Sequence, residues 1–136
     1  MTQEDKKLLL KDLAARLPYK VNVCLYEKET CILMGIDRYE VYLDVDSDSF
    51  RIESIKPYLR PMPSMTEEEK DEYSSFVLRE YDGYLNDDMP DYTGKHYVYT
   101  DNVNIFTDWL NAHHFDHRHL IEKGLALEAP EGMYNI

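Results

Sequence analysis

The stretch Ile55-Lys56-Pro57-Tyr58-Leu59-Arg60-Pro61-Met62-Pro63-Ser64-Met65-Thr66 separates two parts of the chain that differ in character. Its three prolines fix φ, remove backbone donors and push the residues before them toward extended geometry. We therefore expect that neither a helix nor a central strand runs through it. Tyr58, Leu59 and Met62 are apolar enough to hold the stretch against the rest of the protein. The sequence thus predicts a packed connector at residues 56–65.

The residues before this connector, 1–55, show the pattern of one helix followed by short strands. Thr2 and Asp5 mark a helix start, and leucines then recur at helical spacing until Leu17-Pro18. From Lys20 onward the apolar period changes to two, which predicts an antiparallel meander of about four strands. Such a meander can also curl into a small SH3-type barrel, and the sequence does not choose between these two forms.

The first two predicted strands bring two cysteines close together. A two-residue turn at Glu27-Lys28 would place Val23 opposite Ile32, and the same register would place Cys24 opposite Cys31. Glu-Lys suits such a turn poorly, since Asn-Gly or Asp-Gly is preferred, so a longer loop with a shifted register stays an alternative. We expect two free thiols rather than a disulfide. Together with the absence of a leader-like segment, this indicates a cytoplasmic protein.

Residues 66–136 are predicted to form an acidic, mainly helical layer. The run Thr66-Glu67-Glu68-Glu69 has the form of a capping box at the start of one helix. A second helix is expected beyond Asn102, with Trp109 on its apolar face, and a last short helix at 116–123. The tail after it is expected to be a short edge strand or an extended segment.

We therefore predict one α+β domain spanning residues 1–136. It consists of an N-terminal helix and antiparallel meander (1–55), the proline connector (56–65) and the acidic, mainly helical layer (66–136).

The charge of the chain is strongly negative and unevenly distributed. The net charge is −12, and residues 1–65 carry 10 basic and 11 acidic side chains against 5 and 16 in residues 66–136. An acidic half repels phosphate backbones and anionic lipids, so we expect neither direct nucleic-acid binding nor membrane binding. The charge suits an unknown, basic protein partner, although acidic surfaces also serve solubility. An acidic mimic of nucleic acid is a further alternative, which would need carboxylates arrayed on one face.

Candidate metal ligands concentrate in His113-His114-Phe115-Asp116-His117-Arg118-His119. Imidazole and carboxylate are ligands of zinc and similar metals, so His113, His114, Asp116 and His117 are the candidate centre of a metal-dependent hydrolase. The expected break at Phe115-Asp116 places His113 and His117 on different elements, and no HExxH or CxxC pattern accompanies them. We assign no catalytic residue and no cofactor, and the hydrolase stays an alternative.

Three stretches carry a resemblance to a known family. They are Leu13-Ala14-Ala15-Arg16-Leu17-Pro18-Tyr19, the run from Lys56 to Glu69, and the run from Asp108 to Asp116 continuing at Leu120–Leu127. In these stretches the chain resembles a family of short uncharacterised proteins from phages and mobile elements of anaerobic gut bacteria. Members of that family often have Tyr in place of His117 and Gly in place of His119, which weakens the metal hypothesis. The resemblance implies no activity, and we expect a small accessory protein that binds another macromolecule.

Overall fold

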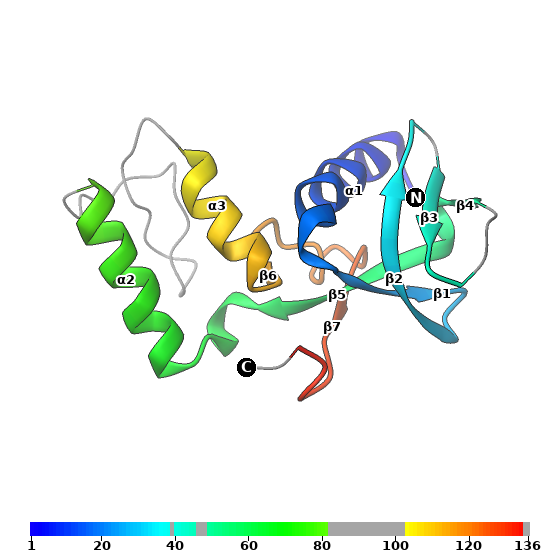
Figure 1. Cartoon of the computed structure of the whole chain (residues 1–136). Coiled ribbons are helices and arrows are strands. Elements are labelled where there is room, and N and C mark those ends of the chain that lie inside the picture. Colours follow the sequence, from blue (N-terminus) through cyan, green and yellow to red (C-terminus); the bar gives the residue numbers. More distant parts are fainter. Residues whose placement is uncertain (39, 46–48, 82–102, 135–136) are drawn as a thin grey trace. The chain divides into compact units, whose positions relative to one another are not determined.

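The computed structural model describes residues 1–38, 40–45, 49–81 and 103–134 (Figure 1). The chain divides into two compact units, one formed by Met1–Leu59 with Arg118–Ile136 and the other by Arg60–His117. An N-terminal helix, a mixed sheet and later helices agree with the predicted α+β class. The chain passes between the units twice, once at Leu59–Arg60, within the stretch predicted to be a connector, and once at His117–Arg118. The single domain stays a prediction.

The first unit contains one long helix and most of the strands. Its elements are α1 (Gln3–Arg16), η1 (Leu17–Tyr19), β1 (Asn22–Leu25), β2 (Glu29–Ile36), β3 (Glu40–Leu43), β4 (Ser49–Arg51), η2 (Ile52–Ser54), most of β5 (Ile55–Pro61) and β7 (Leu127–Glu128). The predicted start of α1 is confirmed, because Thr2 and Asp5 cap each other's backbone in a capping box. The helix ends at Arg16, just before Pro18, as predicted.

The sheet of this unit has the strand order β4-β3-β2-β1-β5, with β7 also paired to β5. The predicted meander is confirmed, because β1, β2, β3 and β4 pair in succession and antiparallel. Strand β5 is antiparallel to β1, whereas β7 is parallel to β5, so the sheet is mixed. Strands β4 and β5 lie at the two ends of this order, yet only the three residues of η2 join them.

The prediction that no central strand runs through the proline stretch is wrong, because β5 pairs with β1 and with β7. The Tyr26 amide donates to the Ser54 carbonyl at 2.9 Å, so Tyr26 and Ser54 mark a hydrogen-bonded position at the end of the β1–β5 ladder. Bonded pairs alternate along an antiparallel ladder, so Pro57, opposite Val23, falls at a position where no donor is needed. The φ that proline fixes is also compatible with extended backbone.

The register predicted from a two-residue turn is wrong by one residue, and the alternative with a longer loop is confirmed. Val23 lies opposite Cys31, and Cys24 lies opposite Thr30. The turn contains Tyr26 and Glu27, both at positive φ, and the Lys28 amide donates to the Leu25 carbonyl at 3.0 Å. Neighbouring strand positions face opposite sides of a sheet, so the two thiols point away from each other. Both cysteines are buried and free.

The core of the first unit is continuous and includes residues from both ends of the chain. Its buried members are Leu9, Leu13, Val21, Val23, Leu25, Cys31, Leu33, Val41, Leu43, Ile52, Ile55, Leu59, Leu120, Leu125 and Ala126. The predicted short helix at 116–123 is wrong, because the backbone there forms turns closed by a bond from the Leu125 amide to the Leu120 carbonyl. Residues from Arg118 onward belong to the first unit, and the layer 66–136 stays a prediction. The expected edge strand in the tail is confirmed as β7.

The second unit contains η3 (Met62–Ser64), α2 (Glu67–Tyr81), α3 (Val103–Ala112) and β6 (Phe115–Asp116). The capping box of α2 is confirmed by bonds from the Glu69 amide to Thr66 Oγ1 (3.1 Å) and from the Thr66 amide to Glu69 Oε1 (2.9 Å). The helix expected beyond Asn102 is also present, although Asn102 itself lies outside the described residues. None of the helices in the described part is long and apolar enough to cross a membrane.

Candidate functional site

The four candidate metal ligands at 113–117 lie in the second unit, where two of the imidazole rings are hydrogen-bonded to other groups of the same chain. His113 Nδ1 lies 2.8 Å from the Trp109 carbonyl oxygen, and its ring stacks on the indole with 3.9 Å between centroids. A carbonyl only accepts, so this Nδ1 carries a proton and donates. His117 Nε2 contacts Asn111 Oδ1 at 2.8 Å, and this ring nitrogen is likewise a donor. In the neutral form of each ring, the lone pair therefore lies on the other nitrogen, His113 Nε2 or His117 Nδ1.

The other two candidates, His114 and Asp116, take part in the backbone pairing of the same unit. The His114 carbonyl accepts from the Arg60 amide at 2.8 Å, and Asp116 is buried in β6, opposite Pro61 on β5. Among the described residues, which include all four candidates, no three His, Cys, Asp or Glu side chains are placed to share a metal ion. His113 and His114 thus form a turn that joins α3 to β6.

Arg60 organises this part of the second unit, a role that its sequence context did not predict. Its guanidinium forms a bidentate pair with Glu69, at 2.8 Å and 2.6 Å, and also donates to the His113 carbonyl at 3.2 Å. The guanidinium carbon lies 4.1 Å from the centre of the Phe115 ring. Burial alone would raise the pKa of Glu69, but hydrogen bonds from Arg60 and Thr66 outweigh it and hold the pKa below its usual value.

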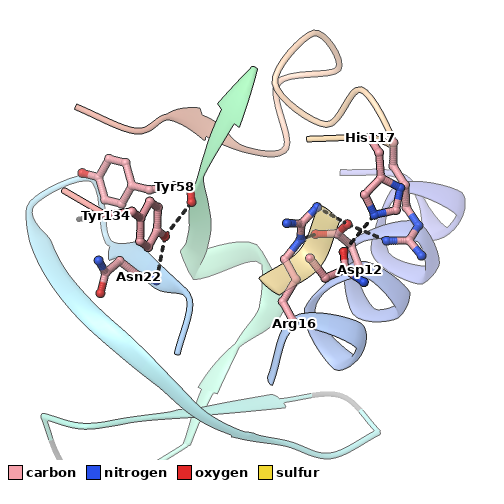
Figure 2. Close-up of polar contacts among 8 residues, drawn as sticks. Asp12, Arg16, Asn22, Tyr58, His117 and Tyr134 are labelled. Carbon is pink, nitrogen blue, oxygen red and sulfur yellow. Dashed lines mark hydrogen bonds and ion pairs between the residues drawn. The ribbon is translucent and has the colours of Figure 1, made fainter. Parts of the chain in front are cut away.

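A second buried charge cluster lies in the first unit, on α1 (Figure 2). Arg16 donates to both carboxylate oxygens of Asp12, at 2.7 Å and 3.1 Å, and Arg118 donates to Asp12 at 2.8 Å. Asp12 and Arg16 are completely buried. Their spacing of four residues on a helix is the signal that sequence reasoning could have used, but no pattern before Arg118 or around it links that residue to them. The cluster ties α1 to the returning C-terminal segment.

The exposed face of the β2–β3 hairpin is apolar at its centre. Leu33 pairs with Leu43 and Gly35 with Tyr42, so Met34 is the extra residue of a β-bulge. The exposed fractions are 61% for Met34, 38% for Tyr42 and 49% for Val45. A glycine inside a strand pattern is a known sign of a bulge, and Gly35 could have indicated this one.

Two carboxylates of the same hairpin are held in fixed positions by hydrogen bonds. Asp37 accepts from the Glu40 amide (3.0 Å) and from the Tyr42 hydroxyl (2.8 Å), and Asp44 accepts from the Ile32 amide (2.8 Å). The hydrogen bond to Asp37 also raises the pKa of Tyr42, because it stabilises the protonated phenol. The hairpin thus exposes apolar side chains and carboxylates, and Asp37 holds the ring of Tyr42 in place. We call Met34, Tyr42 and Val45, with Asp37 and Asp44, the hairpin surface.

Comparisons of the chain with protein-family models, with curated proteins and with solved structures found no match.

Proposed function

We propose that this protein is a non-catalytic binding protein whose hairpin surface docks a basic segment of a protein partner. The observation that carries the proposal is the bulge at Met34, which leaves this side chain 61% exposed next to the Gly35–Tyr42 pair. A bulge re-aims a side chain at a cost to the ladder, and bulges are frequent beside functional sites. Methionine adapts its shape to varied partners, which suits an exposed contact residue.

Tyr42 supplies a second contact whose position is already fixed. A Cβ placed on Gly35 would lie 3.6 Å from the Tyr42 ring, so the ring packs over the glycine, and Asp37 holds its hydroxyl. An aromatic side chain that is ordered before binding loses little conformational entropy on association. Tyrosine is also among the residues that dominate binding energies at interfaces.

The charge of the hairpin supports a basic partner over other classes. Residues 29–45 contain four acidic side chains and one basic side chain. Carboxylates beside an apolar centre complement lysine and arginine on a protein and repel nucleic-acid and lipid phosphates. The excess of acid on the whole chain would speed the encounter with such a partner at low salt.

We infer three further properties along with the binding role. The family resemblance supports a role in a phage or mobile element, and the free, buried Cys24 and Cys31 support a cytoplasmic location. An SH3-type curl of the sheet is supported by the short η2 link between the two outermost strands of the order β4-β3-β2-β1-β5. Three residues span only about 10 Å, and so short a link between the end of β4 and the start of β5 favours a curled sheet.

The alternatives rank lower. A hydrolase centred on 113–117 would need its candidate ligands grouped around one point, whereas among the described residues no three His, Cys, Asp or Glu side chains are placed to share a metal ion. An acidic mimic of nucleic acid would need a carboxylate array, whereas the carboxylates of the hairpin surface flank an apolar centre.

The binding proposal is tested by affinity capture from host lysate with the wild-type chain and two matched variants. Met34→Ser removes the central apolar contact. Tyr26→Asn is the control, because Tyr26 is equally exposed (59%) but lies on the β1–β2 turn, and asparagine tolerates its positive φ. We expect one basic protein to be retained by the wild type and by Tyr26→Asn, lost with Met34→Ser, and released by added salt.

Retention that is unchanged by Met34→Ser would overturn the proposal, as would a retained partner that is acidic or that resists salt. Sedimentation of the purified chain with and without Met34→Ser identifies a second copy as the occupant. Self-association that depends on Met34 would replace the basic partner with a homodimer.

A further inference from the structure

A pocket of about 480 Å³ lies beside α1 in the first unit, and none of the residues of the hairpin surface lines it. It is bounded by the first turns of α1, by the residues at the start of β3, by the end of β4 and by η2. Its charged lining consists of Lys6, Lys7, Arg38, Arg51, Glu40 and Glu53. This volume lies within the range of about 300–1,000 Å³ that is typical of small-molecule sites.

The sign of the charge in this pocket is opposite to that of its surroundings. The unit as a whole carries 11 basic and 14 acidic side chains, whereas the pocket is lined by four cations and two carboxylates. Both carboxylates have cationic neighbours, because Lys6 pairs with Glu53 at 2.9 Å and Glu40 lies opposite Arg51 across β3 and β4. Four cations against two carboxylates leave the lining with a net charge of +2.

The remaining lining includes apolar groups. Leu10 is half-buried and Ile52 is buried, and both reach the pocket between the charged residues. Guanidinium and ammonium groups bind phosphate and carboxylate through charge-assisted hydrogen bonds, while apolar side chains favour a hydrocarbon portion of a ligand. A site with both kinds of group selects a molecule with both.

We propose that this pocket binds a small organic anion. Lys7, Arg38 and Arg51 hold its phosphate or carboxylate groups, and its apolar part lies against Leu10 and Ile52. The site is too small for a folded partner and is independent of the hairpin surface, so either proposal can fail without the other.

The test is a titration of the isotope-labelled full chain, followed through its backbone amide resonances. The probes are phenyl phosphate, phthalate and inorganic phosphate. We expect phenyl phosphate or phthalate to shift the amides of 3–10, 38–40 and 51–53, and inorganic phosphate to bind several-fold more weakly because it lacks an apolar part. Tighter binding of phenyl phosphate would identify phosphate as the preferred anionic group, and tighter binding of phthalate would identify carboxylate.

Charge-reversal variants connect the shifts to the pocket. Arg51→Glu and Lys7→Glu should each weaken binding about tenfold or more, since each replaces an attractive group with a repulsive one. Lys28→Glu is the matched control, because Lys28 is an exposed cation of the same unit that does not line the pocket. Lys7 is itself exposed, so its variant keeps the test valid if Arg51→Glu disturbs the β3–β4 pairing.

Three results would overturn the proposal: no shifts with either organic anion, shifts scattered over the chain, or equal weakening by Lys28→Glu. The last two would indicate binding to positive charge in general rather than to this pocket.

Discussion

Asp12 shows how a single residue can decide the stability of the first unit. Its carboxylate is completely buried and accepts three hydrogen bonds from Arg16 and Arg118. A buried ion pair is not strongly stabilising when compared with apolar residues, but removing one partner leaves an uncompensated buried charge. Replacing Asp12 would therefore leave the buried guanidinium of Arg16 without this carboxylate.

We predict that Asp12→Asn lowers the free energy of unfolding by about 3–5 kcal/mol. Urea denaturation of the variant and the wild type measures this difference. Glu4→Gln, which changes an exposed acid on the same helix, serves as the control and should lose no more than about 1 kcal/mol. A loss for Asp12→Asn as small as that of the control would show that the cluster contributes little.

The same residue predicts a pH dependence. Burial alone would raise the pKa of Asp12, but Arg16 and Arg118 together outweigh it and hold the pKa below its ordinary value. A carboxyl whose pKa is lower in the folded state stabilises the fold above its unfolded pKa, near 4, and loses that contribution as the pH falls through the folded pKa. The difference in free energy of unfolding between the wild type and Asp12→Asn should thus be largest at neutral pH and shrink below pH ~4. A gap that is constant with pH would contradict this origin.

At the scale of elements, the β1–β2 turn is strained. Tyr26 and Glu27 both adopt positive φ, which disfavours residues with a Cβ unless they are Asn or Asp. The turn is retained because Val23 and Leu25 on β1 and Cys31 and Leu33 on β2 must share the core face. Packing of the strands therefore overrides the local preference of the turn.

We predict that Glu27→Asn raises the free energy of unfolding by up to about 1 kcal/mol, because asparagine tolerates the left-handed region. Thermal or urea unfolding detects the gain. Glu29→Asn is the matched control, since Glu29 lies in extended strand β2, where asparagine is disfavoured. A gain from Glu29→Asn, or a loss from Glu27→Asn, would count against strain at the turn.

The packing of α3 in the second unit depends on Trp109. Its ring lies 5.1 Å from Tyr73 of α2, stacks on His113, and is parallel to Phe115 of β6 at 6.2 Å between centroids. The indole N–H donates to Glu72 at 3.3 Å, and the side chain is only half-buried. Trp109 thus connects the two helices and β6.

We predict that Trp109→Ala lowers the stability of the second unit by about 3 kcal/mol, the low end for a tryptophan truncation, because the ring is half-exposed. Trp109→Phe should lose less, since it keeps an aromatic ring between Tyr73 and Phe115. Circular dichroism during urea unfolding measures both. Native emission of the indole should lie to the blue of the unfolded chain and be partly quenched by acrylamide. Fully quenched, red-shifted emission from folded protein would contradict this packing.

At the scale of the whole chain, Tyr134 joins the C-terminal tail to the sheet (Figure 2). Its hydroxyl accepts from the Asn22 amide at 3.0 Å and donates to the Tyr58 carbonyl at 2.8 Å. The bonded residues are 112 and 76 positions away in sequence. Burial is the largest cause that raises the pKa of Tyr134, from the usual 10 to about 12.

We predict that Tyr134→Phe lowers the free energy of unfolding by about 1–2 kcal/mol at neutral pH, because two partly buried backbone groups, the Asn22 amide and the Tyr58 carbonyl, lose their partner. A raised folded pKa means that the phenol stabilises the fold fully below pH 10 and loses this contribution as the pH rises toward 12. The variant should therefore be less sensitive to alkali over this range. Tyr26→Phe, at an exposed position, is the control, and equal effects of the two substitutions would contradict the role of Tyr134.

The sequence by itself determined the features that depend on neighbours along the chain. The capping boxes at Thr2 and Thr66 were predictable because the cap and its partner are three residues apart. The meander of β1 to β4 was predictable because apolar residues alternate at the period of a strand. The bulge at Met34, next to Gly35, also carried a readable signal, because a glycine inside a strand pattern indicates a bulge.

Only the tertiary structure decided the features that depend on residues far apart in the chain. The proline stretch becomes strand β5 because β1 supplies a ladder in which Pro57 needs no donor. The tail returns to the first unit because that unit's core takes in Leu120 and Leu125, which no local pattern indicates. Arg60 and Arg16 look like surface residues in sequence, and become buried because Glu69 and Asp12 compensate their charge. Burial of a charge is decided by its partner, and the partner is placed by the fold.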